Sequence, residues 1–216
     1  MKLSANNLNN SKLLTHICQG GKLLFMKRFL VILVLIFSFQ IPSFADDIRD
    51  FQIGGMSIGD SALDYFSEEM INSNIGKTSY KSKKFYHVGI EDSTKFEMYN
   101  VVQLHFKKND NKFIIHSISG NSRMEIKSCL NRQKEIYEEI SELFTDIKKY
   151  DAGKRKHPSD ESGKSFTYDM YFQFKSKDVI VVSCYDWSEK ISAADKLLIA
   201  IDTKEFNDFL NNEAHK

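Results

Sequence analysis

The strongest structural signal in the chain is a run of alternating apolar and polar residues from Phe166 to Phe174. Its apolar positions are Phe166, Tyr168, Met170, Phe172 and Phe174, and the positions between them are Thr167, Asp169, Tyr171 and Gln173. A period of two places these sets on opposite faces of a β-strand. A strand with one apolar and one polar face is typical of an antiparallel sheet, because parallel strands are usually buried on both faces.

Five other segments predict strands, and one long segment predicts a helix. The predicted strands are 84–90, 98–106, 113–119, 166–174, 178–186 and 197–201. Apolar residues at helical spacing predict the long helix over 128–150, and cap signals predict shorter helices at 60–65, 67–74 and 202–211. The polar segment 151–165 is predicted to be a loop. We therefore predict an α+β fold, with an antiparallel sheet of two three-stranded meanders packed against one long and several short helices.

The predicted long helix and the predicted strand 178–186 each carry a cysteine on the apolar face, Cys129 and Cys184. These two positions are expected to meet at the helix–sheet interface. The third cysteine of the chain, Cys18, lies in the N-terminal segment that is predicted to be removed, so two cysteines remain in the predicted domain. An even number of cysteines in an exported protein indicates a disulfide, and a bond over this separation contributes about 4 kcal/mol through loop entropy. The alternative is two separate buried thiols. A redox-active pair is disfavoured because no C-x-x-C motif is present.

Residues 26–45 have the features of a secretory signal peptide. Two basic residues follow Met26, an apolar run extends from Phe29 to Phe39, and small residues at Ser43 and Ala45 precede a predicted cleavage site. Residues 1–25 are interpreted as an upstream extension, with Met26 as the true start. The alternative is that they form a long n-region of the signal peptide, which predicts the same destination. The predicted product is a periplasmic or secreted single domain, 46–216. The alternative is an uncleaved segment that anchors the protein in the inner membrane.

The charge balance of the predicted domain disfavours nucleic acid as a partner. The first 45 residues contain five Lys or Arg and no acid, so 25 basic and 29 acidic residues remain. Such a balance produces no strong positive field. A membrane is expected as a partner only if the N-terminal segment is retained.

No metal or cofactor is predicted. The histidines after residue 45 are His87, His105, His116, His157 and His215. They form no H-x-H or H-E-x-x-H motif, so a zinc site would need ligands that the spacing does not indicate. Satisfied or exposed histidines are the preferred interpretation.

The segment Gly55 to Gly59 contains a literal G-x-S-x-G motif around Ser57. A hydrolase nucleophile elbow needs a buried strand before the serine and a parallel sheet beneath it. The preceding segment, 46–53, has only three apolar residues, and the downstream strands alternate as antiparallel ones do. We therefore interpret the motif as an entry into a helix capped by Asp60 or Ser61. No catalytic residue is predicted.

Three aromatic residues form a candidate binding patch: Tyr171, Tyr185 and Trp187. They are expected on the strand face away from Cys184. A partly exposed aromatic patch suits a protein, peptide or glycan partner. The alternative is that another helix covers these rings.

The segments SFADDIRDFQIGGMSIGDSALDYFSEE, SISG…SCL and VIVVSCYDWS resemble a family of small secreted proteins from oligotrophic marine alphaproteobacteria. The resemblance spans most of the predicted domain. It implies an exported location and no assigned activity.

The predicted signal peptide, the predicted α+β domain and the lack of a predicted catalytic residue together predict a non-catalytic periplasmic binding or interaction module. The alternatives are a periplasmic hydrolase and a membrane-tethered envelope protein.

Overall fold

The structure is a computed structural model that describes residues 47–76, 80–92, 94–158 and 160–214. The predicted extension, 1–25, and the predicted signal peptide, 26–45, lie outside these ranges and stay predictions. No helix in the described ranges has the length and apolar character needed to cross a membrane.

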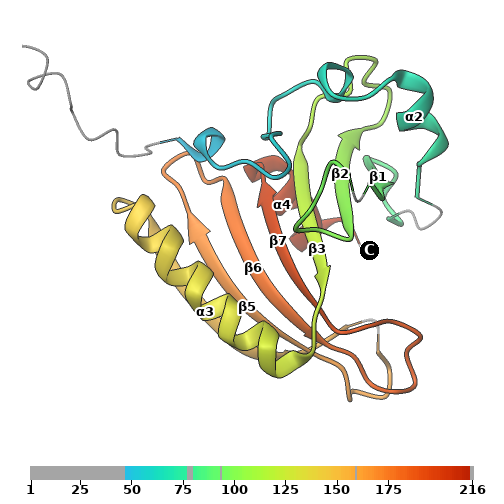
Figure 1. Cartoon of the computed structure of the whole chain (residues 1–216). Coiled ribbons are helices and arrows are strands. Elements are labelled where there is room, and N and C mark those ends of the chain that lie inside the picture. The colour runs from blue at the N-terminus through green and yellow to red at the C-terminus, as the bar shows by residue number, and fades with distance from the viewer. Residues whose placement is uncertain (1–46, 77–79, 93, 159, 215–216) are drawn as a thin grey trace, which may run out of the picture. The chain divides into compact units, whose positions relative to one another are not determined.

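One seven-stranded antiparallel sheet forms the centre of the domain, in the order β1-β2-β3-β7-β6-β5-β4 (Figure 1). Its strands are β1 (Phe85–Ile90), β2 (Val101–Lys107), β3 (Ser117–Arg123), β4 (Lys148–Lys156), β5 (Phe166–Gln173), β6 (Val179–Asp186) and β7 (Lys196–Asp202). Strands β1 to β3 form one meander and β4 to β7 another, joined through the β3–β7 pair. The α+β prediction is confirmed, but the second meander has four strands rather than three.

The additional strand, β4, occupies a segment predicted to be helix and polar loop. The long helix, α3 (Ile126–Leu143), ends seven residues before its predicted end at Tyr150. Strand β4 has the sequence KKYDAGKRK, which lacks alternation because it lies at the sheet edge and is largely exposed. Charged edge strands resist pairing with other chains. A register shift at Gly153, which has φ +62°, bends this edge.

Strand β3 begins and ends later than predicted. The predicted strand was 113–119, with Gly120 as its terminator, but pairing continues to Arg123. Gly120 is an interior position because the Tyr99 ring packs against it, and an added Cβ would lie 2.4 Å from that ring. A glycine in a strand therefore marks a close side-chain approach here rather than a turn.

The short helices begin at the expected kinds of residue. Helix α2 (Glu68–Ser73) is capped by Ser67, and α4 (Lys204–Asn212) is capped by Thr203, whose side chain accepts a hydrogen bond from the Phe206 N–H. The predicted helix 60–65 is a single 3₁₀ turn, Ala62–Asp64, capped by Ser61.

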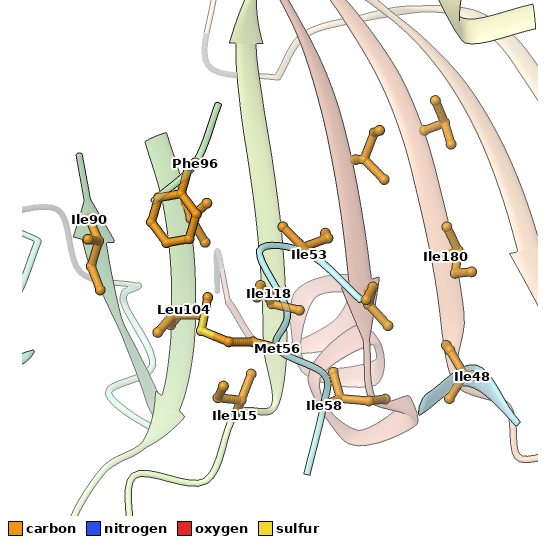
Figure 2. Packing of buried hydrophobic residues seen from close by; sticks show 14 of the residues in the cluster. Ile48, Ile53, Met56, Ile58, Ile90, Phe96, Leu104, Ile115, Ile118 and Ile180 are labelled. Atoms are coloured by element: carbon orange, nitrogen blue, oxygen red, sulfur yellow. The ribbon is translucent and has the colours of Figure 1, made fainter. Parts of the chain in front are cut away.

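One face of the sheet, called the covered face below, is closed by α3 and by the segment 48–58. Figure 2 shows Ile48, Ile53, Met56 and Ile58 of this segment directed onto Leu104, Ile118 and Ile180 of the strands. All of these residues belong to one buried hydrophobic cluster. Figure 1 shows α3 lying across β5 and β6 on this side and α4 behind the sheet.

Cys129 of α3 and Cys184 of β6 are joined by a disulfide on the covered face. Their Cα atoms are 5.9 Å apart, and both residues are fully buried. One turn further along α3, the Gln133 side chain donates hydrogen bonds to the carbonyls of Tyr168 and Val182. The helix is therefore attached to the sheet by a covalent bond and by hydrogen bonds to two strands.

Candidate functional site

The opposite face of the sheet, called the polar face below, carries mostly hydrogen-bonding side chains, together with three apolar ones. Strand register places these residues side by side across five strands: Gln103, His105, Ser117, Ser119, Asn121, Leu198, Ala200, Asp202, Val181, Ser183, Tyr185, Thr167, Asp169 and Tyr171. The small serines and Ala200 lie in the middle, and larger side chains surround them. Short side chains flanked by long ones leave the centre of this face hollow.

This hollow, called the central cleft below, has a volume of about 390 Å³. Helix α4 covers only one end of the polar face, where Phe206 and Phe209 pack on Phe85 of β1. Tyr80 packs edge-on against Phe209, with ring centroids 5.0 Å apart. The cleft volume is in the range of pockets that hold small ligands.

Asp169 lies on one side of the central cleft and is surrounded by donors. Its carboxylate accepts hydrogen bonds from Arg155 at 2.6 and 3.0 Å, from Thr167 at 2.8 Å and from Ser183 at 2.6 Å. The same guanidinium donates to the Tyr171 hydroxyl at 2.6 Å. A carboxylate with this many donors is well satisfied. Its role is to fix Arg155 at the rim, where the Arg155 side chain is 52% exposed.

Asp202 lies at the end of β7 and has far fewer partners. The residue is 5% exposed and makes no ion pair with any described residue. Burial raises the pKa of its carboxyl to about 6, and a hydrogen bond from Ser117 opposes that rise. Because no cation neutralises this buried carboxyl, its oxygens retain lone pairs that can accept hydrogen bonds from a ligand in the cleft.

His105 is a neutral group at the α4 end of the cleft. Burial, with a smaller contribution from His87, lowers its pKa to about 3. Its ring packs against Phe206 at 4.5 Å, and within the described ranges Nδ1 has no hydrogen-bond partner. His105 is therefore suited to hydrogen bonding rather than to proton transfer near neutral pH.

The three aromatic residues of the predicted patch lie in one region of the polar face. Tyr171 and Tyr185 line the central cleft, and the Tyr185 and Trp187 rings stack with centroids 5.7 Å apart. The centroids of the His157 and Trp187 rings are 4.3 Å apart. All three patch residues are half-buried. Tyr150, on β4, lies 6.3 Å from the Tyr171 ring and extends this aromatic region.

A second hollow of about 230 Å³, called the Trp187 pocket below, adjoins the central cleft. Its lining residues are Asn100, Val101, Gln103, Asn121, Arg123, Trp187, Ala193, Ala194 and Lys196. Gln103 lines both hollows, so the two share a wall.

Ser57 lies away from the polar face, among the residues that close the covered face. It is 3% exposed, and its hydroxyl donates to the Phe51 carbonyl at 3.2 Å. Only a 3₁₀ turn and an isolated bridge precede it in the described chain, rather than a buried strand. Its backbone N–H donates to Asp60, so the segment is built as a turn.

No arrangement for a metal is found in the described residues, where no group of three or more His, Cys, Asp or Glu side chains converges. The polar connector 157–165 is organised by Asp160, which accepts hydrogen bonds from Ser165 at 2.6 Å and Ser188 at 3.0 Å. This aspartate attaches the connector to the chain that follows β6.

Several residues of the cleft were absent from the sequence prediction. The sequence pattern places Arg155 in the predicted loop 151–165 and Asp202 at the start of the predicted helix 202–211. The sequence signal for the cleft is the polar face of two predicted strands, because Gln103 and His105 on 98–106 and Asp169 on 166–174 alternate with core residues. Alternation does not show which polar side chains surround a hollow.

The comparisons with known proteins identify no family. No protein-family model matches the chain, and no curated protein matches it. Among solved structures, the chain is similar to the Ran-binding protein Mog1p of Saccharomyces cerevisiae, with 15% identity and a TM-score of 0.29. The match covers 66% of this chain and 85% of Mog1p. At that TM-score the likeness carries no inference about function.

Proposed function

We propose that this protein is a non-catalytic binding module that holds a small hydroxyl-rich ligand, such as a glycan fragment, in the central cleft. The observation that carries the proposal is the hollow polar face. Serine hydroxyls, the Asp202 carboxyl and the Gln103 amide surround a cleft bordered by tyrosine rings. Neutral and acidic hydrogen-bonding groups beside aromatic rings suit the hydroxyls and the C–H faces of a sugar.

The arrangement of the serines favours binding over hydrolysis. The Ser183 hydroxyl donates to the saturated Asp169 carboxylate, and the Ser117 hydroxyl bonds to Asp202. A serine nucleophile needs a positioned base to remove its proton, and a carboxylate held by several donors is a weak base. These serines serve better as hydrogen-bonding partners.

The test measures binding to protein recovered from the periplasm of an expression host. Trp187 is the only tryptophan in the chain and borders the polar face, so its fluorescence reports on this region. Neutral sugars and short peptides are titrated, and affinity is confirmed by calorimetry. Saturable binding of a sugar with a change in Trp187 emission is expected. Binding of peptides alone would replace the glycan proposal with a peptide one.

Matched variants locate the binding. Ser119→Leu places a bulky side chain in the centre of the cleft and is expected to abolish binding. Ser128→Leu makes the same change at an exposed position on α3 and is expected to leave binding intact. Equal binding by both variants would contradict the cleft as the site.

We also propose that the protein is exported to the periplasm and cleaved near Ala45. The signal-like sequence 26–45 and the buried disulfide support this location, because disulfides persist in oxidising compartments. Intact-mass measurement is expected to place Asp46 at the N-terminus. A mass that retains Phe29 to Phe39 would favour the membrane-tethered alternative.

A further inference from the structure

The Trp187 pocket has a charge distribution unlike that of the central cleft. Its lining contains two cations, Arg123 and Lys196, and no acidic residue. Neither cation forms an ion pair within the part of the chain that the structure describes. By contrast, two cations that border the central cleft side of this face are paired, since Lys107 contacts Glu205 at 2.6 Å and Arg155 contacts Asp169.

Arg123 and Lys196 are direct cross-strand neighbours. They are register partners in the β3–β7 pair and lie on the same face. Like charges in directly opposed positions of an antiparallel pair destabilise the sheet. This arrangement is therefore unfavourable unless an anion lies between the two cations or beside them.

Lys196 is also partly removed from water. Its Nζ lies 4.7 Å from the centre of the Tyr185 ring, and burial lowers the pKa of the ammonium group. The aromatic ring compensates for part of the lost hydration. An anionic group in the adjacent pocket would compensate for the remainder, because an opposite charge at short range favours the protonated lysine.

Two further atoms at this pocket lack hydrogen-bond partners among the described residues. They are Asn121 Oδ1 and the indole Nε1 of Trp187. A buried polar atom without a partner costs about 1–3 kcal/mol. One is an acceptor and the other a donor, so an anion that also bears a hydroxyl would suit both. Both atoms are shielded from solvent, so a ligand contacts them only if the Asn121 and Trp187 side chains rotate.

From this geometry we propose that the Trp187 pocket is a subsite for an anionic group, held by Arg123 and Lys196. Through Gln103 the pocket adjoins the central cleft, so one ligand can extend across both hollows. The ligand class is a hydroxyl-rich molecule with a carboxylate, sulfate or phosphate at one end. Binding of the sugar portion of this ligand rests on the proposed function of the central cleft. Binding of its anionic group rests on Arg123 and Lys196.

The experiment titrates the full processed protein with matched probes at constant ionic strength, read by Trp187 fluorescence and calorimetry. The probes are a neutral hexose, the corresponding uronic acid and the corresponding 6-phosphate, followed by inorganic sulfate and phosphate alone. An acidic sugar is expected to bind about tenfold or more tightly than the neutral hexose, because its hydrogen bonds are charge-assisted. The uronic acid and phosphate arms distinguish a carboxylate from a phosphate ligand.

Variants separate the anion subsite from the sugar site. Arg123→Gln and Lys196→Gln are each expected to remove the preference for the acidic sugar while retaining weak binding of the neutral one. The matched control is Lys127→Gln, an exposed lysine on α3, which is expected to keep the preference. Arg123→Gln is also expected to raise the melting temperature of the ligand-free protein, because it removes the like-charge pair.

The outcomes distinguish the two proposals. Equal affinity for neutral and acidic sugars would overturn the anion subsite and leave the proposed function standing. Binding of sulfate or phosphate that depends on Lys196, without binding of any sugar, would support the subsite and overturn the glycan proposal. An unchanged acidic preference in both glutamine variants would overturn the subsite.

Discussion

Phe172 and Tyr171 are neighbours on β5, yet they lie on opposite faces of the sheet. Phe172 is fully buried on the covered face, where its ring packs 5.0 Å from Tyr137 of α3. Tyr171 is half-buried on the polar face and accepts a hydrogen bond from Arg155. The covered face obtains its stability from apolar burial and a disulfide, so the polar face is free to retain a hollow lined with hydrogen-bonding groups.

The largest expected effect contrasts these two neighbours. Phe172→Ala creates a cavity in the core and is expected to lower the free energy of unfolding by about 3–5 kcal/mol. Tyr171→Ala is expected to cost about 1 kcal/mol, because its environment is polar and partly hydrated. Urea denaturation of both variants measures the difference. Equal losses would show that the two faces contribute similarly to stability.

The disulfide provides the next test. Replacing Cys129 and Cys184 together by alanine is expected to lower the free energy of unfolding by about 4 kcal/mol, since the unfolded chain loses a closed loop. Because the bond is buried, the control is urea denaturation of the native protein in the presence of dithiothreitol, in which unfolding exposes the bond to the reductant, and it is expected to give a similar loss. Below the melting temperature, ligand binding on the polar face is expected to persist. Insensitivity to reduction would contradict a structural role for the bond.

Asp202→Asn, unlike the preceding substitutions, is expected to raise the free energy of unfolding. The Asp202 pKa is about 6 in the folded protein against 3.8 in the reference state, so the folded form binds the proton more tightly. That contribution to stability is present below pH 3.8 and is lost as the pH rises towards 6. The uncharged variant is therefore expected to gain up to about 3 kcal/mol near pH 7.5.

The gain from Asp202→Asn is expected to shrink as the pH is lowered, and thermal unfolding over a pH series measures it. The pKa of His105 is lowered to about 3, so His105 makes both proteins less stable as the pH falls below its reference pKa of 6.5. This contribution is the same in the two proteins and cancels when their stabilities are subtracted. Ligand affinity is expected to fall in the same variant. A variant that is less stable at every pH would show that Asp202 is structural rather than reserved for a ligand.

The smallest expected effect concerns Ser57. Ser57→Ala removes one hydrogen bond to the Phe51 carbonyl and is expected to cost about 1 kcal/mol or less. A fluorophosphonate probe is expected to leave Ser57 unlabelled, because the side chain is buried. Labelling of Ser57, detected by peptide mass spectrometry, would support the hydrolase alternative.

The parts of the fold that were predictable are those with a strong local pattern. Apolar alternation predicted β5 and β6, and Ser67 was correctly predicted to cap α2. Strand β4 was missed because an exposed edge strand has no apolar face and therefore no alternation. The same segment contains Arg155, so the missed strand also concealed the charged rim of the cleft.

Local patterns along the chain are sufficient to predict strands with one apolar and one polar face, a long amphipathic helix, and two cysteines at apolar positions. Local spacing encodes these properties, because side-chain direction follows the backbone period. No local pattern indicates that β3 pairs with β7, that α4 covers one end of the polar face, or that Arg123 lies opposite Lys196; these are features of the folded domain. Those contacts join residues far apart in the chain, and their register depends on how all seven strands pack together.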